Sequence, residues 1–408
     1  MTDLARPAVT TDQLEASGSA PRRVGYDRVL FAVVIILMAL GIVLVYSASI
    51  VSAQQNFGDA QHYLKRQSIY AVLTLTVMGV FMNVHYMFWA RVAKWVLGAA
   101  ILGLIMVLIP GLSTVAKGAA RWISLGPIRI QPSEVVKLAW LIFLAFFVAL
   151  RKGNLHNFRE SWTVPLVCMS VIGVLLMAQP DFGSTVICAG MMVLTLWVGG
   201  ARWLHMGFLM CTGAGLAVLA VLAEPYRMKR IMAFLDSSQD QLNVSYHIRQ
   251  ALISFGSGSW QGLGLGESRQ KLFYLPEAHT DFVFSILGEE LGFIGVVVVV
   301  GLYLIFFWRG MLAARRSKTL FGAVLAFALT AEIGFQALTN MAVTMALLPT
   351  KGLTLPFISF GGSSMVTLGL AVGILLNVSR NQSTPMAFRQ LFDARKPTPR
   401  DKGKGWAL

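Results

Sequence analysis

The chain has 408 residues, of which 56% are hydrophobic and only 13% are charged, and its mean hydropathy is +0.66. Soluble domains carry about 25% charged residues, so this composition excludes an ordinary soluble protein and indicates a membrane protein. The formal net charge of +15 is attributed to membrane topology and anionic lipid rather than to nucleic-acid binding.

The hydropathy pattern predicts helices that cross the membrane. Ten apolar runs follow one another, and they are continuous rather than alternating, which favours helices over a closed barrel. They lie near residues 29–50, 68–85, 92–110, 134–150, 162–178, 183–200, 204–223, 281–307, 320–346 and 355–378. We therefore predict an all-α polytopic membrane protein with ten transmembrane helices.

The predicted spans divide the chain into a membrane domain and two tails. Residues 1–28 form a polar N-terminal tail, residues 29–378 the membrane domain, and residues 379–408 a basic C-terminal tail. One large extracytoplasmic loop covers residues 224–280, between the seventh and eighth spans. Ten spans place both termini on one side, and 21 Lys and Arg residues on that side against 12 on the other predict cytoplasmic termini.

Several polar residues meet where the large loop enters the eighth span. His279, Thr280 and Asp281 lie at this junction, and Glu289 and Glu290 follow inside the apolar run. Asp281 is either a residue favoured by the helix dipole or a general base, and a base there would need burial or a neighbouring anion to raise its pKa. His279 and Thr280 could orient it or the substrate. Glu289 lies too far along the helix to join it, so Glu289 and Glu290 are predicted to give structural support by pairing with buried cations.

Four further ionisable residues lie in or beside the predicted spans. Glu134 and Lys137 are three residues apart and share a helix face, either as an ion pair that packs a helix end or as functional groups. Asp181 precedes the sixth span, where it is either a helix cap or a site residue. Glu332 lies inside the ninth span without a partner suggested by the sequence, so it is predicted to face the bundle interior in a supporting role.

Cations are frequent in the short outer loops, although the topology rule disfavours them there. Either they extend to lipid headgroups, or they form an outward-facing site for an anionic, phosphorylated substrate. They are Lys65, Arg66, Lys117, Arg121, Arg129 and Lys351.

Glycines mark two further segments. Residues 256–266 of the large loop contain five glycines but lack the strand and helix of a nucleotide-binding motif. These glycines are predicted to allow tight turns and close approach of the backbone over a site. At the start of the tenth span, Gly361 and Gly362 precede Ser363, which indicates either a packing seam of small residues or the lining of a substrate site.

One candidate base, several outer cations and a lipid-facing cavity fit a transfer reaction in which a phosphorylated lipid is the leaving group. The cations would stabilise charge that develops on the phosphate. A divalent cation, Mg²⁺ or Mn²⁺, could assist, although the sequence identifies no metal ligands and no covalently bound cofactor.

Five motifs in the same order closely resemble the SEDS (shape, elongation, division, sporulation) family of peptidoglycan glycosyltransferases. The resemblance covers about residues 28–380, and the segment from Leu348 to Pro356 is more similar to the division member than to the elongation member of the family. The motifs are Arg121–Lys137, Gln179–Gly183, Leu275–Asp281, Gly288–Gly292 and Pro356–Ser364.

The resemblance implies an inner-membrane enzyme that polymerises glycan from lipid II at the division septum. Asp281 would deprotonate the acceptor 4-hydroxyl, which attacks a lipid-pyrophosphate-linked chain with inversion. A class B penicillin-binding protein would be the obligate partner, with other division proteins around it. The residues implied to face the pyrophosphate are Arg66, Arg121 and Lys137. The residues implied to line the same cavity are Glu134, Asp181 and Ser363.

Two other functions remain open. A flippase for a lipid-linked precursor would also need buried ionisable residues, but it needs a path through both leaflets, whereas the chemical candidates cluster on the outer side. A non-catalytic division scaffold would make Asp281 dispensable.

Overall fold

The computed structural model describes most of the membrane domain. The described residues are 25–111, 113–116, 119–125, 128–151, 155, 158–223, 228, 232, 244–271, 278–349 and 352–380. The predicted C-terminal tail beyond residue 380, nearly all of the N-terminal tail and about half of the predicted large loop lie outside these ranges.

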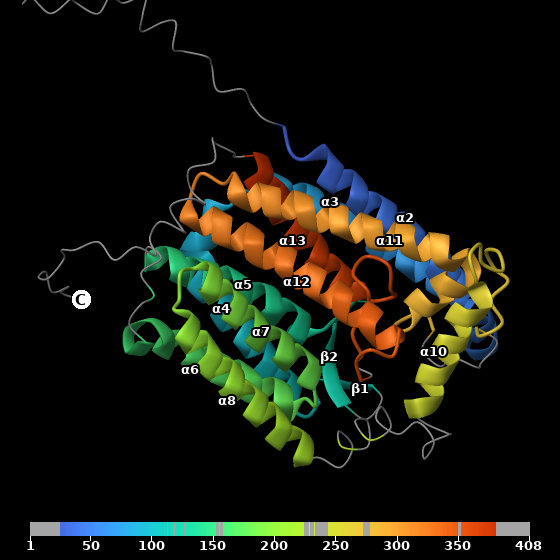
Figure 1. Ribbon diagram of the computed structural model, residues 1–408, viewed down its shortest axis with the longest axis horizontal. Coiled ribbons are helices and arrows are strands. Elements are labelled where there is room, and N and C mark those ends of the chain that lie inside the picture. The colour runs from blue at the N-terminus through green and yellow to red at the C-terminus, as the bar shows by residue number, and fades with distance from the viewer. Residues whose placement is uncertain are drawn as a thin grey trace, which may run out of the picture.

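Long helices packed side by side form the body of the molecule (Figure 1). The helices are α2 (Arg28–Phe57), α3 (His62–Asn83), α4 (Met87–Leu108), α5 (Pro132–Leu150), α6 (Phe158–Ala178), α7 (Phe182–Val198), α8 (Trp203–Leu222), α10 (Val244–Gly258), α11 (Val283–Arg315), α12 (Leu320–Thr344) and α13 (Gly362–Arg380).

Each of the ten predicted apolar ranges overlaps one of these helices. Seven of them are long and apolar enough to cross a membrane, namely α2, α4, α5, α8, α11, α12 and α13. Helices α6 and α7 contain shorter apolar segments, and α3 is less apolar than the other nine helices that overlap the predicted ranges. The body is therefore that of a helical polytopic membrane protein, and the count of ten spans stays a prediction.

Polar residues at the helix starts explain several of the boundaries. Asp27, Asp181 and Thr319 each accept a hydrogen bond from the backbone N–H three residues on, at 3.0, 3.1 and 3.1 Å. Each bond satisfies a donor that the first turn of a helix leaves without a partner. Helix α5 begins with Pro132, which is suited to that position because no N–H is needed there.

The core lies around α12, between α5, α11 and α13. In the apolar window of α12, 83% of the residues are buried inside the protein, against 6% for α8. Helix α8 lies at the edge of the bundle (Figure 1). The ionisable residues Lys137 of α5 and Glu332 of α12 are consequently buried, at 3% and 5% exposed.

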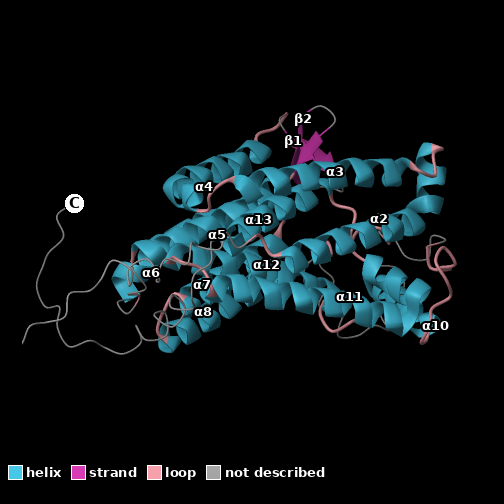
Figure 2. Cartoon of the chain, turned by 90° about the horizontal axis from the view of Figure 1, so that it is seen from above, coloured by secondary structure: helices cyan, strands magenta, loops and turns pink. Residues whose placement is uncertain are grey.

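A small sheet adds to the helical structure between α4 and α5. Strands β1 (Ser113–Ala116), β2 (Ala119–Leu125) and β3 (Ile128–Ile130) are antiparallel in that order. The sheet lies against α4 and α5, at the edge of the helical body in Figure 2. The prediction of a purely helical chain missed it, although the apolar–polar–apolar pattern of β3 suits a half-buried strand.

Helix α11 is broken at Gly292, whose φ of 65° and ψ of −164° are not helical. An unbroken helix would pair the N–H groups of Phe293 and Ile294 with the carbonyls of Glu289 and Glu290. The break removes both hydrogen bonds, so four backbone groups need other partners.

The turn that follows α10 supplies these partners. Ser259 and Trp260 accept the two N–H groups after the break at 2.9 and 3.3 Å, while Leu263 and Gly264 donate to the two carbonyls before it at 2.9 and 3.0 Å. A Cβ on Gly262 would overlap the backbone of α11. The loop glycines thus allow the turn after α10 to approach the backbone of α11 closely.

The two described ends of the chain lie at one end of the bundle. Asp27 N–H donates to Ser379 Oγ at 3.2 Å, and Arg309 Nη2 lies 2.7 Å from Asp27 Oδ2. We call this the termini end. The start of α11 and the turn after α10 lie at the opposite end (Figure 1), which we call the site end.

Candidate functional site

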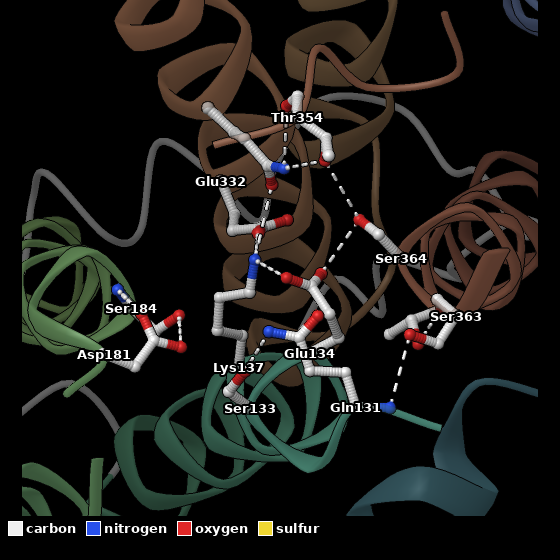
Figure 3. A network of polar contacts seen from close by, with 12 residues as sticks. Gln131, Ser133, Glu134, Lys137, Asp181, Ser184, Glu332, Thr354, Ser363 and Ser364 are labelled. Carbon is white, nitrogen blue, oxygen red and sulfur yellow. Dashed lines mark hydrogen bonds and ion pairs between the residues drawn. The ribbon is translucent and has the colours of Figure 1, made fainter. Parts of the chain in front are cut away.

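A buried lysine lies at the centre of the bundle. Lys137 on α5 is 3% exposed, and its Nζ lies 3.0 Å from Glu134 Oε1 and 3.7 Å from Glu332 Oε1 on α12 (Figure 3). It also donates to Gln336 Oε1 at 3.5 Å. The predicted pair of Glu134 and Lys137 is therefore present, and Glu332, for which the sequence suggested no partner, shares the same ammonium group.

Two hydroxyl residues extend this cluster toward α13. Ser364 donates to Glu134 Oε2 at 3.0 Å and lies 3.5 Å from the hydroxyl of Thr354. Gln336 Nε2 donates to the carbonyl of Thr354 at 3.1 Å. Ser363 points elsewhere, because its hydroxyl accepts a hydrogen bond at 3.3 Å from the backbone that leads into α5 (Figure 3).

The charge balance of the cluster favours a functional role over packing alone. The gap lined by Lys137, Trp140, Cys188 and Glu332 is too small to hold a water molecule. Removing an ion from water costs several kcal/mol even in a real protein, with an idealised cost on the order of 20 kcal/mol. Two carboxylates therefore share one ammonium group here, which is more acidic charge than a neutral packing pair requires.

Asp281 lies at the site end, just before α11. The helix begins at Val283 and its N-cap, Phe282, makes no side-chain capping bond, so Asp281 is one position outside the helix. Asp281 is half-buried. Asn340 Nδ2 donates to its backbone carbonyl at 2.9 Å, and a Cβ on Gly352 would lie 3.4 Å from its Oδ2.

One face of α12 connects the lysine cluster with the aspartate. Glu332, Gln336 and Asn340 are spaced four residues apart and share that face; they are 5%, 0% and 1% exposed. The stripe begins at Lys137 and ends at Asp281, a rise of about 12 Å over eight residues.

Sequence reasoning missed four members of this arrangement. For two of them the signal was present, because polar residues at four-residue intervals in an apolar run mark one helix face. The other two depend on how α13 docks, which no local pattern reveals. The four are Gln336, Asn340, Thr354 and Ser364.

Arg121 and Asp181 lie together at the turn between α6 and α7, apart from the buried lysine. Arg121 donates to the carbonyls of Gln179 and Pro180 at 2.9 and 2.5 Å. Asp181 caps α7 by accepting hydrogen bonds from Ser184 N–H and Oγ at 3.1 and 2.8 Å (Figure 3). In this structure both residues stabilise the turn, and their contacts with a substrate stay predictions.

The other outer cations differ in their surroundings. Lys65 lies 2.8 Å from Asp59 on the surface, and hydrogen bonds from Lys65 and from the N–H of Gln61 hold the pKa of the Asp59 carboxyl below its usual value. The side chains of Arg66 and Arg129 are exposed and make no hydrogen bond or ion pair within the described ranges. Two more predicted cations lie outside those ranges: Lys117 and Lys351.

His279 and Thr280 lie half-buried next to Asp281. The ring of His279 is 4.4 Å from that of Tyr63 on α3 and 5.9 Å from that of Phe360, measured between centroids. The carbonyl of His279 accepts a hydrogen bond from Phe360 N–H at 3.0 Å. The segment that carries the aspartate is thereby attached both to α3 and to the segment before α13.

Glu289 and Glu290 attach the loop after α10 to the first half of α11. Glu289 accepts hydrogen bonds from a hydroxyl and a backbone N–H of residues 268–269, at 2.6 and 2.9 Å. Glu290 Oε1 lies 3.3 Å from Lys271 Nζ and 2.5 Å from Ser47 Oγ on α2. Glu290 thus contacts a cation, whereas the described partners of Glu289 are neutral.

Metal binding has no preformed site among the residues that the structure describes. No three His, Cys, Asp or Glu side chains of that part of the chain lie close enough to hold an ion together. Mg²⁺ is commonly held by one or two carboxylates with water and substrate phosphates.

Comparison with known proteins agrees with this architecture. The family model FtsW/RodA/SpoVE, described as "Cell cycle protein", matches residues 27–384. A relative from Alkalilimnicola ehrlichii, named "Probable peptidoglycan glycosyltransferase FtsW", is 42% identical over 375 residues, which cover 91% of this chain and 92% of the relative.

Two solved structures are similar in fold. One is described as "Structural coordination of polymerization and crosslinking by a peptidoglycan synthase complex"; it aligns with a TM-score of 0.72 and 28% identity over 88% of this chain and 98% of that chain. The other is the rod shape determining protein RodA of Thermus thermophilus, with a TM-score of 0.66 and 27% identity over 89% and 100%. With the family model matching nearly the whole membrane domain, the chain belongs to the FtsW/RodA/SpoVE (SEDS) family of cell cycle proteins.

Proposed function

We propose that this protein is a peptidoglycan glycosyltransferase that polymerises lipid II, with Asp281 as its general base. The observation that carries the proposal is the position of Asp281 at the site end, where Asn340 holds its backbone and a buried polar stripe leads to Lys137. The name of the relative from Alkalilimnicola ehrlichii supports the substrate class.

In the proposed reaction, Asp281 takes the proton from the 4-hydroxyl group of the acceptor sugar. The oxygen attacks the anomeric carbon of the donor, and the bond between that carbon and the pyrophosphate oxygen breaks. The lipid pyrophosphate leaves with the electron pair, and attack from the opposite face inverts the configuration. A positioned general base contributes about 10²- to 10⁴-fold to such a rate.

Cations would stabilise the departing pyrophosphate. Arg66 is exposed and makes no hydrogen bond or ion pair within the described part of the chain, so its guanidinium group can meet the pyrophosphate directly. Arg121 and Lys137 are engaged with backbone carbonyls and carboxylates, so contact with the pyrophosphate would require them to exchange partners. Glu134 and Glu332 would then hold Lys137 until the substrate enters.

The proposed setting is the division septum of the bacterial inner membrane, with both termini in the cytoplasm. A class B penicillin-binding protein is the proposed partner, because the similar solved structure belongs to a complex that coordinates polymerization and crosslinking. Other division proteins would surround the pair.

The test is polymerisation of purified lipid II by the protein together with a class B penicillin-binding protein. We expect glycan strands from the wild type and none above background from Asp281→Asn that is folded and partner-bound. Chelation of divalent cations in the same assay should lower the rate if the pyrophosphate is bound with a metal ion. Normal polymer from Asp281→Asn would refute the assignment of the base.

The same preparation separates the rival functions. A flippase would produce no polymer but would move fluorescent lipid II between the leaflets of a vesicle. A scaffold would do neither, and its Asp281→Asn variant would support division as well as the wild type does.

A further inference from the structure

Helix α4 carries two cations within its own length, near the termini end of the bundle. The helix starts at that end, where Tyr86 N–H donates to the side chain of Asn377 on α13 at 2.8 Å. It has 22 residues and is therefore about 33 Å long, hardly more than the hydrocarbon core of a bilayer at about 30 Å. Arg91 and Lys94 thus lie inside a membrane helix, at the boundary between headgroups and hydrocarbon, and not in a loop.

Neither cation has an acidic partner in the described part of the chain. Both side chains are exposed and make no hydrogen bond or ion pair with the described residues. Asp27 lies at the same end but pairs with Arg309 at 2.7 Å. The first turn of α4 contains no acidic residue, so the positive end of the helix dipole adds to the two charges. Because an unpaired charge at membrane depth is costly, an anion from outside the chain would stabilise both cations.

A third cation approaches from the neighbouring helix α5. Lys94 Nζ lies 5.8 Å from the centroid of the Phe146 ring, and Arg151 Cζ lies 5.7 Å from that of Phe147. The ring of Phe143 lies 6.5 Å from each of these two rings. Cations from two helices therefore border one aromatic cluster. Basic patches between membrane helices are typical binding sites for anionic headgroups.

The rest of this face of α4 suits contact with acyl chains. Trp95, Gly98 and Leu102 follow Lys94 at spacings of three or four residues, so they share its face. Trp95 and Leu102 are 81% and 61% exposed, and a Cβ on Gly98 would meet no atom within 4 Å. Trp is enriched at the level of the headgroups. Helix α4 also lies at the edge of the helical body (Figure 2), so a lipid with its headgroup at the cations can extend its chains along this face.

The position of the patch distinguishes its ligand from the proposed substrate. The start of α11 and Asp281 lie at the site end, whereas Arg91 and Lys94 lie near the termini end. A lipid-linked sugar that reacts beside Asp281 has its pyrophosphate at the opposite membrane surface. The anion that the bilayer itself supplies at the termini end is the phosphate of a phospholipid, to which both residue types donate charge-assisted hydrogen bonds.

We propose that Arg91, Lys94 and Arg151 form a binding site for the headgroup of an anionic diacyl phospholipid, in the leaflet at the termini end. The site is separate from the candidate glycosyltransferase site and does not depend on that function. The bound lipid neutralises the cations of α4 and bridges α4 to α5. Because it binds the folded protein, it should also stabilise the fold.

Native mass spectrometry of the full-length protein in detergent measures this binding. The anionic probe is phosphatidylglycerol, and phosphatidylcholine with the same acyl chains is the probe without net charge. We expect the wild type to prefer phosphatidylglycerol. Arg91→Gln/Lys94→Gln should bind it about 25-fold more weakly, since each cation near a membrane surface contributes about fivefold, and should lose the preference. Arg91→Lys/Lys94→Arg keeps both charges and should keep the preference.

A second pair of exposed cations at the same end provides the matched control. Arg316 and Lys318 lie in the turn between α11 and α12, so Arg316→Gln/Lys318→Gln removes the same charge without touching α4. Phosphatidylglycerol should raise the unfolding temperature of the wild type and of this control more than phosphatidylcholine does, but not that of Arg91→Gln/Lys94→Gln. In phosphatidylcholine all three should unfold at nearly the same temperature.

Three results would overturn the inference. The first is equal affinity of the wild type for the two lipids. The second is unchanged affinity of Arg91→Gln/Lys94→Gln for phosphatidylglycerol. The third is an equal loss of affinity in Arg316→Gln/Lys318→Gln, which would show that any cation at the termini end attracts the lipid.

Discussion

Asp281 is held in place through its backbone. A single amide, Asn340 Nδ2, donates to the carbonyl of Asp281 at 2.9 Å and to that of Leu353 at 2.6 Å. The candidate base is thereby tied to α12 and to the segment before α13 at once. Because an error of about 1 Å in the position of a reacting group can cost about 10²-fold in rate, Asn340 is a positioning residue in this account.

Replacing Asn340 by Ala should therefore lower polymerisation by roughly tenfold or more, and it should destabilise the protein by about 1–3 kcal/mol because two carbonyls lose a buried donor. Thr339→Ala is the control, since the Thr339 hydroxyl bonds only within its own helix, to Phe335 C=O at 2.7 Å. Initial rates and unfolding temperatures of both variants provide the measurement. Equal rates for the two would remove Asn340 from the site.

A second prediction concerns the ion pairs of Lys137 with Glu134 and Glu332. Lys137→Met should destabilise the protein by about 3–5 kcal/mol, because it leaves two carboxylates buried without a cation. Glu332→Gln keeps the side-chain shape and should unfold near the wild-type temperature, and adding it to Lys137→Met should restore part of the loss. Unfolding in detergent measures all three, and a stable Lys137→Met variant would contradict the shared-ammonium description.

Among the elements, the turn after α10 takes over the hydrogen bonds that α11 loses at Gly292. Four backbone bonds from Ser259, Trp260, Leu263 and Gly264 replace the two that the break removes. The first half of α11, which follows Asp281 directly, is thus braced by the extramembrane loop. Substitutions in this loop should therefore alter the position of Asp281 through α11.

Substitutions at two glycines with positive φ distinguish the support that the turn gives to α11 from ordinary backbone strain. Gly58→Ala, at φ 69° with open space around it, should cost only about 1–2 kcal/mol. Gly262→Ala, at φ 79°, would also press a methyl group into the backbone of α11. We expect Gly262→Ala to lower the unfolding temperature further and to reduce polymerisation, whereas Gly58→Ala keeps the rate. Identical effects of the two substitutions would show that the close approach is unimportant.

The described ends of the chain and the candidate site lie at opposite ends of the helix bundle. Asp27 and Ser379 mark the termini end, and Asp281 and the loop after α10 mark the site end. If the termini are cytoplasmic, as the charge count predicts, the candidate site faces outward, where lipid-linked sugars are polymerised in the proposed reaction.

Cysteine labelling checks this orientation. With Cys168, Cys188 and Cys211 replaced, Glu267→Cys at the site end should react with an impermeant maleimide on intact spheroplasts. Lys318→Cys at the termini end should react only after the membrane is opened; both positions are exposed. The reverse pattern would invert the topology and place the candidate site in the cytoplasm.

Much of this arrangement follows from the sequence, because local patterns dictate it. Long apolar runs predicted the helices, and the ionisable residues within them marked Lys137 and Asp281 as candidates. The pairing of Lys137 with Glu332 joins residues 195 positions apart, so only the packing of α5 on α12 reveals it. The break at Gly292 was hidden for a similar reason, since an apolar run appears continuous until a second segment is seen to replace its hydrogen bonds.

The initial rate of glycan polymerisation by Asp281→Asn shows whether Asp281 is the general base. The variant and the wild type would be compared at equal concentration, with the same class B penicillin-binding protein and purified lipid II, after both are shown to unfold at the same temperature. We expect a rate at least about 10²-fold lower for Asp281→Asn, because a general base is lost. A rate within a factor of two of the wild type would contradict it.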